Sequence, residues 1–258
     1  MTRNVVITGA SSGIGAALAS MLTERGDRVI GVDLRDAEVA ADLSRPEGRA
    51  AAVERIGRLC AGVVDAVITC AGTSVPGEAM VTVNVFGTTE LVTGLQPMLA
   101  ASAAPRVVLV GSISGTQQAD PAVVGACLAG DEAAALEHAR TAMAEGRPQQ
   151  LYPSSKSAIA QWARRTAVSR GWADAGIAVN VVAPGVVLTP MSAGLFDDPR
   201  MRAIMDRAVP MPLHGYAEAA DIARVLAFLA DAGTTHLTGQ VIYVDGGAEA
   251  SLRDPAVF

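Results

Sequence analysis

The 258-residue chain is poor in cysteine and in aromatic residues, and it contains no long apolar run. Its three cysteines, Cys60, Cys70 and Cys127, occur singly and without C-x-x-C spacing, which argues against a zinc knot, a redox pair or a disulfide scaffold. A reduced, cytoplasmic location is therefore expected. No apolar run approaches the roughly 18 residues that cross a bilayer. Glycines also interrupt the apolar segment that follows Arg3, so neither a membrane span nor a signal peptide is predicted.

Basic residues are not gathered anywhere along the chain. The formal net charge is −6, and Lys and Arg are dispersed, so no footprint on a phosphate backbone and no patch for an anionic membrane is predicted. His138, His214 and His236 lie far apart in the sequence without ligand spacing, so we expect them at the surface and predict no metal. The sequence therefore points away from nucleic acid, membranes and metals as partners.

Short β-branched segments alternate with longer stretches that are rich in Ala and Leu. The segments are nearly continuous in Val and Ile, which is typical of strands buried on both faces of a parallel sheet. They comprise residues 4–8, 28–33, 65–70, 106–111, 177–183 and 240–245, and the helical stretches run over about 13–25, 46–61, 82–100, 153–171 and 217–231. This alternation predicts an α/β, doubly wound Rossmann-type fold with helices on both faces of a parallel sheet. Because no linker interrupts the chain, residues 1–258 are expected to form one domain.

A glycine-rich turn directly follows the first strand. The sequence TGASSGIGAAL places Gly9, Gly13 and Gly15 between that strand and the next helix, where glycines let the backbone approach a pyrophosphate at the positive helix end. The second strand ends at Asp33, 18 residues beyond Gly15. A carboxylate there can accept hydrogen bonds from both ribose hydroxyls of an adenosine, and it repels a 2′-phosphate. The turn thus predicts a dinucleotide site, and Asp33 favours NAD over NADP.

The preference for NAD has one competing group. Arg35 carries a guanidinium that can take a 2′-phosphate, but Ser12 leaves no second basic group in the glycine loop. The structural alternatives are a glycine turn without a ligand and a solvated acid at the end of the second strand.

The spacing of these glycines, with three residues between the first pair, resembles the classical type of the short-chain dehydrogenase/reductase family. Further motifs agree in order between residue 4 and about 250, namely Asp42-Leu43, Ala71-Gly72, Asn84, Pro184-Gly185 with Thr189, and Asp245-Gly246-Gly247. Thr69 and Cys70 replace the usual Asn-Asn pair, which puts the contact of the missing amide in doubt. The resemblance implies that NAD is held by Gly9, Ser11, Ser12, Gly13, Ile14, Gly15, Asp33, Asp42, Leu43, Ala71, Gly72, Tyr152, Lys156, Pro184, Gly185, Val187 and Thr189.

The stretch QLYPSSKSAI sets Tyr152 four positions before Lys156 at the start of a helical stretch. Hydride transfer to a ketone makes an alkoxide that needs a proton, and the reverse reaction must remove it. A free tyrosine with a pKa of about 10 is a poor base at neutral pH, but an ammonium on the same helix face lowers that pKa. The resemblance implies that Tyr152 is the acid/base, that Lys156 lowers its pKa and holds the ribose, and that Asn84 holds a water beside Lys156. It also implies that Ser112 orients the carbonyl, with Ser114 as the alternative.

The distance along the chain between Ser112 and Tyr152 departs from the family pattern. The gap holds 39 residues instead of about a dozen, so we expect a helical insertion between the fifth strand and the active-site helix, at about 117–148. The second half of the insertion shows a capping acid, one apolar face and a terminating glycine, which are Asp131, then Leu136, Ala139 and Met143, and finally Gly146. A second, short apolar helix is expected before it.

A further departure is a short connection of 11 residues between Gly72 and Asn84, which predicts a trimmed wall of the site. The two departures together resemble the bacterial 3α-hydroxysteroid dehydrogenase/carbonyl reductase branch of the family, to which coniferyl-alcohol dehydrogenases are also similar. Residues 188–215 contain several methionines, Leu195 and Phe196. We expect them to form an apolar, adaptable lid over a bulky substrate.

The expected function is therefore an NAD-dependent oxidoreductase that interconverts a secondary alcohol and a ketone on a bulky hydrophobic substrate. The alternatives are an aryl alcohol dehydrogenase of the coniferyl type and a non-catalytic NAD-binding sensor. In the family, the helix that bears the tyrosine often packs against another subunit. An insertion emerging just before Tyr152 could block that face, so a homodimer is expected rather than a tetramer.

Overall fold

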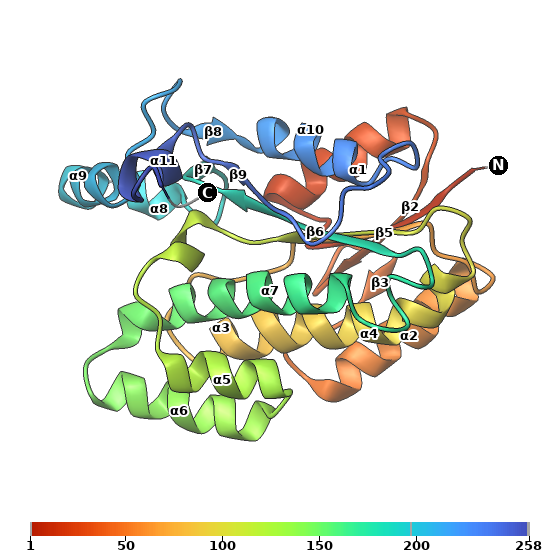
Figure 1. Ribbon diagram of the computed structural model, residues 1–258, viewed down its shortest axis with the longest axis horizontal. Coiled ribbons are helices and arrows are strands. Elements are labelled where there is room, and N and C mark those ends of the chain that lie inside the picture. The colour runs from red at the N-terminus through yellow and green to blue at the C-terminus, as the bar shows by residue number, and fades with distance from the viewer. Residues whose placement is uncertain (1, 197, 257–258) are drawn as a thin grey trace.

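The computed structural model describes residues 2–196 and 198–256, and within them the core is a seven-stranded parallel sheet (Figure 1). The strand order is β3-β2-β1-β4-β5-β6-β9. The order reverses direction between β1 and β4, which is where ligands bind in open sheets of this kind. The strands are β1 (Asn4–Thr8), β2 (Arg28–Asp33), β3 (Val39–Ala40), β4 (Ala66–Thr69), β5 (Arg106–Val110), β6 (Ala178–Pro184) and β9 (Val241–Val244).

Helices cover both faces of the sheet (Figure 1). Successive strand residues point to opposite faces, so Val5 and Ile7 pack toward one helical layer and Val6 toward the other, each fully buried. One layer consists of α1 (Gly13–Glu24) and α10 (Ala219–Leu229), and the other of α2 (Pro46–Leu59), α4 (Gly87–Ala100) and α7 (Leu151–Ala167). The predicted doubly wound, single-domain fold is confirmed.

Three very short strands were not predicted from the sequence. They are β3 and the pair β7 (Val187–Leu188) and β8 (Ala217–Glu218), each of two residues, too short to carry a periodic pattern. The helix predicted over 82–100 is also less regular than expected. It begins with α3 (Ala79–Val81), passes through a π-helical turn at Thr82–Phe86 and continues as α4.

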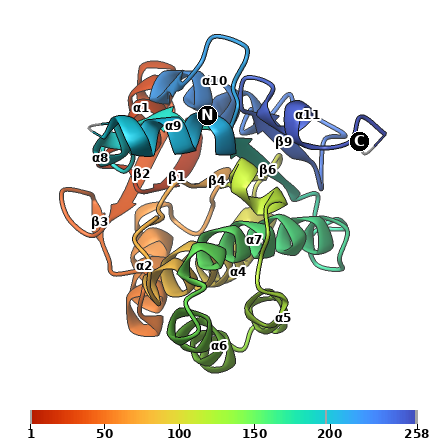
Figure 2. The same cartoon turned by 90° about the vertical axis from the view of Figure 1, so that its left-hand side faces the viewer.

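The insertion forms two helices, α5 (Pro121–Ala129) and α6 (Glu132–Ala144), which lie outside α7 and away from the sheet (Figures 1 and 2). The Asp131 carboxylate accepts a hydrogen bond from Ala134 N at 2.9 Å, and Gly146 follows α6 at φ +73°. The predicted cap and terminator are therefore present.

The apolar face predicted for α6 is partly wrong. Ala139 is buried, but Met143 is 40% exposed. Ala135 and Ala142 complete the buried face instead. Alanines let α6 approach its neighbours closely, whereas the larger Met143 side chain stays at the surface.

Three short helices stand beyond the carboxyl ends of the strands, at one end of the molecule (Figures 1 and 2). They are α8 (Ala193–Phe196), α9 (Pro199–Ala208) and α11 (Ala248–Leu252). The segment predicted as a lid, residues 188–215, contributes the first two. The side chains of Leu195 and Phe196, which were part of that prediction, lie outside the described part of the structure.

The three histidines are exposed, as the sequence predicts. Over residues 2–196 and 198–256, no helix combines the length and the apolar character that crossing a bilayer requires. All three cysteines are unpaired.

Candidate active site

A cavity of about 540 Å³ opens at the carboxyl ends of the strands, at the point where the strand order reverses. It is lined mainly by apolar groups, with a few convergent polar side chains, which is typical of a ligand site. Most of the residues predicted from the sequence line it, namely Gly9, Ser12, Gly13, Ile14, Gly15, Asp33, Asp42, Leu43, Ala71, Gly72, Ser112, Tyr152, Lys156, Pro184, Gly185, Val187 and Thr189. Ser11, which is exposed, and Asn84, which is buried, are not part of this lining.

The glycine turn brings main chain into contact where no side chain would fit. Gly9 adopts φ +66°, and a Cβ there would stand 2.7 Å from Ala71 N. A Cβ on Gly15 would stand only 2.1 Å from Gly9 O, so α1 can pack against the end of β1 only with glycine at this position. Gly13 lies at φ +52°, in the left-handed region that favours glycine.

The first turn of α1 leaves backbone donors for a ligand. Its N-cap, Ser12, makes no hydrogen bond from its side chain to the helix, so the N–H groups of this turn keep their capacity for an anion. The glycine cradle and this helix end together fit a dinucleotide pyrophosphate.

Asp33 lines the end of the cavity that is expected to receive the adenosine. Its carboxylate accepts hydrogen bonds from Ser11 N at 3.0 Å and from Leu34 N at 2.7 Å. Ser11 also uses its hydroxyl, which donates to Arg35 O at 3.0 Å and to Asp36 O at 3.1 Å. Ser11 thus ties the glycine turn to the end of β2 from an exposed position.

Asp42 and Leu43 form the adenine-side wall. The Asp42 carboxylate accepts from the hydroxyl of Ser44 at 2.6 Å and from its backbone N at 3.0 Å. These bonds hold the pKa of Asp42 below its usual value. The Leu43 side chain is buried, and its carbonyl oxygen accepts a hydrogen bond from Arg49 Nε at 2.9 Å.

Arg49 is a buried arginine that supports this wall from outside the cavity. Only 2% of its side chain is exposed, yet it pairs with Glu90 of α4 at 2.8 Å and with Glu132 of α6 at 2.6 Å. Its guanidinium also lies over the Phe86 ring, 5.9 Å from the centroid. The insertion is therefore bonded to the wall that carries Leu43 as well as packed against α7.

Tyr152 and Lys156 share one face of α7 and point into the cavity. Lys156 Nζ lies 5.6 Å from the centroid of the Tyr152 ring and donates to Val110 O at 3.0 Å. Lys156 is the only lysine in the chain. Ser112 lies close enough to the Tyr152 phenol to act on its pKa and lower it, and all three side chains line the same cavity, so the structure brings together the tyrosine, the lysine and the serine that the sequence predicts.

Burial acts in opposite directions on the two titratable groups. It raises the pKa of Tyr152, and the hydrogen bond from Ser112 opposes that rise. It lowers the pKa of Lys156 to about 8, with a smaller opposing effect from Cys70. Both shifts have the same cause, because an apolar site disfavours the charged form of either group.

Asn84 reaches the site indirectly. Its amide oxygen accepts from Thr73 N at 2.8 Å, and its amide nitrogen donates to Thr73 O at 3.0 Å and to Ser155 Oγ at 3.2 Å. The side chain is 2% exposed and stands on the π-helical turn, a local distortion often found at functional sites. The structure thus gives Asn84 the role of a buried amide that holds the loop after Gly72.

Comparison with known proteins identifies the family to which the chain belongs. Residues 9–249 match a family model described as enoyl-(acyl carrier protein) reductase. A 3-alpha-hydroxysteroid dehydrogenase/carbonyl reductase from Comamonas testosteroni is 36% identical over 96% of this chain and 97% of that protein. The chain belongs to the short-chain dehydrogenase/reductase family. Like other members, it is an oxidoreductase that acts on CH–OH groups with a nicotinamide dinucleotide.

Two further relatives extend the likeness to structure and to another substrate. A 3-alpha-hydroxysteroid dehydrogenase from Pseudomonas sp. B-0831, solved in complex with NADH, is 40% identical with a TM-score of 0.89 and covers 97% of this chain and 98% of its own. A cis-4-hydroxycyclohexanecarboxylate dehydrogenase from Sinomonas cyclohexanicum is 31% identical over 96% of this chain and 97% of that protein.

Several residues of this dehydrogenase site were missed by reasoning from the sequence. Cys70 lines the cavity where the family pattern has an amide, and burial raises the pKa of its thiol to about 12. Val110 offers only its carbonyl oxygen, which no side-chain pattern reveals. Pro148 and Gln149, at the end of the insertion, also line the cavity. The position of the insertion just before Tyr152 was the signal that could have found them.

The segment predicted as a lid contributes side chains to the cavity, at the end expected to receive the substrate. Met191, Met205 and Val209 line it. Met211 of the same segment is not part of the lining. Its sulfur accepts a hydrogen bond from Val186 N at 3.2 Å. These side chains are apolar and flexible, and the adaptable lid stays a prediction.

Proposed function

We propose that this dehydrogenase interconverts a secondary alcohol and a ketone on a bulky hydrophobic substrate with NAD(H). The observation that carries the proposal is the arrangement of Tyr152, Ser112 and Lys156 at the rim of an apolar cavity next to a glycine cradle. Bound NAD would supply the hydride acceptor for oxidation, and NADH the donor for reduction.

The protein's own residues then handle the proton and the oxygen. In reduction the Tyr152 hydroxyl donates its proton to the forming alkoxide, and in oxidation the phenolate takes it back. Ser112 donates a hydrogen bond to the same substrate oxygen and stabilises the charge that develops on it. Lys156, when protonated, favours the phenolate and holds the ribose, and Asn84 keeps the neighbouring loop and a water in place.

Asp33 supports a preference for NAD over NADP. Its carboxylate lines the adenosine end of the cavity and repels a 2′-phosphate. Within the described lining of the cavity, Lys156 is the only basic residue, and it stands at the nicotinamide end.

The proposed substrate is a steroid-like or other bulky alicyclic alcohol or ketone. The apolar substrate end supports it, as do the relatives named for a 3-alpha-hydroxysteroid and for a hydroxycyclohexanecarboxylate. Residues 188–215 are proposed to close over this substrate.

The proposal is tested with a substrate panel measured under both NAD and NADP. The panel holds a 3α-hydroxysteroid, a substituted cyclohexanol and coniferyl alcohol, and the first two should be turned over best, with NAD. Tyr152→Phe should lower kcat by about a thousandfold, in the range of general acid–base contributions, while NADH binding is kept. Substantial turnover by this variant would refute the role of Tyr152, and a silent panel despite tight NADH binding would indicate a sensor.

We also propose a homodimer located in the cytoplasm. Helices α5 and α6 pack outside α7 and cover a face through which another subunit could dock (Figure 2), and the three unpaired cysteines suit a reducing compartment. Light scattering of the purified protein should give the mass of a dimer, and a tetramer would contradict the proposal.

A further inference from the structure

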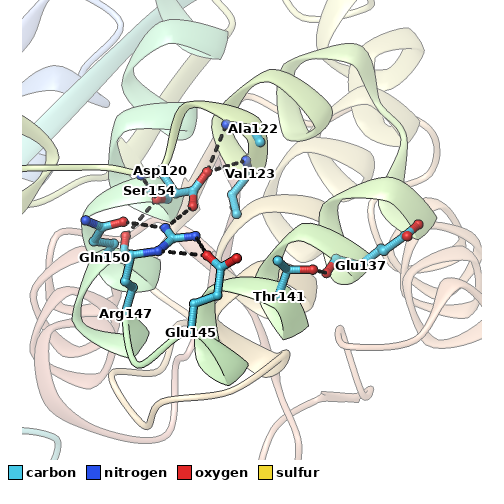
Figure 3. Close-up of polar contacts among 9 residues, drawn as sticks. All are labelled: Asp120, Ala122, Val123, Glu137, Thr141, Glu145, Arg147, Gln150 and Ser154. Atoms are coloured by element: carbon cyan, nitrogen blue, oxygen red, sulfur yellow. Dashed lines mark hydrogen bonds and ion pairs between the residues drawn. The ribbon is translucent and has the colours of Figure 1, made fainter.

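The neck of the insertion, defined here as Asp120, Glu145, Arg147, Gln150 and Ser154, is a cluster of polar side chains outside the cavity lining (Figure 3). Asp120 precedes α5 and Arg147 follows α6, so these two residues mark where the chain leaves and returns. Arg147 Nη1 donates to the Asp120 carboxylate and, at 2.8 Å, to Gln150 Oε1. On its outer side the same guanidinium pairs with Glu145.

Ser154 joins the neck to the first turn of the helix that bears Tyr152. Its hydroxyl donates to Gln150 O at 2.7 Å and accepts from Asp120 N at 2.8 Å, and the side chain is completely buried. Gln150, the N-cap of α7, makes no side-chain cap bond to the helix. The neck therefore restrains an end of α7 that lacks a cap of its own, with Gln150 and Ser154 placed two residues on either side of Tyr152.

The Asp120 carboxylate is charged and nearly buried, so it depends on its partners. Its side chain is 9% exposed, against 34% for Arg147. Burial acts to raise the pKa of Asp120, but bonds from Arg147 and from the backbone of α5 hold it below its ordinary value. Removing the arginine would leave a buried charge without its ion pair, which is costly.

The neck also lies between the two segments that carry Ser112 and Tyr152. The chain runs from Ser112 through the 3₁₀ turn Ile113–Thr116 to Asp120, and from Arg147 through a second 3₁₀ turn, Pro148–Gln150, into α7. A second anchor lies closer to Ser112, where Gly115 packs on α7 so tightly that a Cβ would stand 3.2 Å from the carbonyl carbon of Lys156. The two anchors together set how the serine loop sits against the helix.

We propose that the Asp120–Arg147 pair, acting through Ser154, positions the Tyr152 hydroxyl against Ser112. The inference deepens the proposed function, because it rests on the roles given there to the tyrosine and the serine. Asp120, Arg147 and Ser154 are positioning residues. The other titratable group facing Tyr152 is Lys156 on its own helix, and Cys70, which follows β4, acts on Lys156. Both stay unchanged in the variants below.

The test compares Arg147→Met and Ser154→Ala with a matched control, Glu145→Gln. The control removes the outer ion pair of the same arginine, which does not connect to α7. The readouts are kcat, KM for NAD, and the alkaline titration of Tyr152. That titration is taken from tyrosinate absorbance after rapid mixing, as each variant minus the same variant carrying Tyr152→Phe.

Both neck variants should lower kcat by about tenfold, as a small misplacement of a catalytic group does, with KM for NAD unchanged. They should also raise the Tyr152 titration midpoint, because a loosened Ser112 bond no longer favours the phenolate. Glu145→Gln should match the wild type in all three readouts. If Arg147→Met does not fold, Arg147→Lys, which keeps the charge but not the planar fork, should give a smaller change in the same direction.

The inference is overturned if folded neck variants keep the wild-type midpoint and kcat, or if Glu145→Gln shifts both as much as Arg147→Met does. The absorbance titration needs no turnover. The titration therefore tests whether the neck positions Tyr152 even if Tyr152→Phe remains active and the proposed function is refuted.

Discussion

The half of the cavity proposed for the cofactor and the half proposed for the substrate, called the cofactor half and the substrate half below, are built in different ways. In the cofactor half, backbone segments pack directly against each other. For example, a Cβ on Gly15 would stand only 2.1 Å from Gly9 O. In the substrate half, flexible side chains such as Met205 and Gln149 come from the lid and from the end of the insertion. The cofactor half therefore depends on the positions of the backbone, whereas the substrate half depends on how separate segments pack against each other.

The largest expected effect comes from filling the glycine turn. Gly15→Ala should destabilise the fold by about 3 kcal/mol through overpacking and should abolish NADH binding. Gly125→Ala on α5 is the matched control, because a Cβ there meets nothing within 4 Å and the residue is helical and exposed. It should stabilise the protein by about 0.5 kcal/mol. Denaturant unfolding and fluorescence titration with NADH measure both, and equal effects of the two changes would remove the contrast.

Lys156, at the junction of the two halves, should show its burial in the pH dependence of stability. Burial lowers its pKa in the folded state to about 8, against an ordinary value of 10.5. The unfolded chain therefore binds more protons between these values, and the free energy of unfolding should rise with pH across that window, by about 3 kcal/mol in all. The measurement is the stability of the wild type minus that of Lys156→Met at each pH, which cancels other groups. A flat difference would contradict the shift.

Asp33 should decide between the two nicotinamide dinucleotides. Asp33→Asn removes the charge that repels a 2′-phosphate, so the NAD to NADP ratio of kcat/KM should fall by about tenfold, a modest cost for like charges near solvent. Asp36→Asn changes the same charge three residues later on an exposed side chain and should leave the ratio as it is. A ratio unaltered in Asp33→Asn would refute the role of this carboxylate.

The smallest effect is expected in the lid. Met205→Ala should raise KM for a bulky alcohol by about fivefold, through loss of roughly 1 kcal/mol of apolar contact, and should not change NADH binding. Met201→Ala on the same helix is the control, since Met201 is 40% exposed and lies outside the described cavity lining. An equal change of KM in both variants would argue against contact between Met205 and the substrate.

Residues in short sequence motifs were predicted with the greatest detail. Gly9, Gly13, Gly15 and Asp33 belong to one strand-turn-helix-strand unit, so their relation follows from local geometry. Tyr152 and Lys156 are one helical turn apart, and that spacing alone places them on one face. Ser112 and Asn84 came from motif order in the family, because nothing local connects them with Tyr152.

Contacts between distant segments were not predicted. Arg49 binds Glu132, which lies 83 positions later in the sequence. Neither residue belongs to a motif that predicts this ion pair. Met143 was assigned to the apolar face of α6, but it is 40% exposed, and the structure buries Ala142 instead. Pattern alone does not tell how near a neighbouring helix comes.

The sequence by itself determined the alternation of strands and helices, the glycine cradle, the acid at the end of β2 and the tyrosine-lysine pair. Each of these features follows from residues that are near one another in the sequence. Only the tertiary structure decided that Asp120 and Arg147 close the neck of the insertion, that Arg49 supports the wall that carries Leu43, and which side chains of the lid segment line the cavity. Those contacts join residues far apart in sequence, and their geometry depends on the packing of whole helices against the sheet.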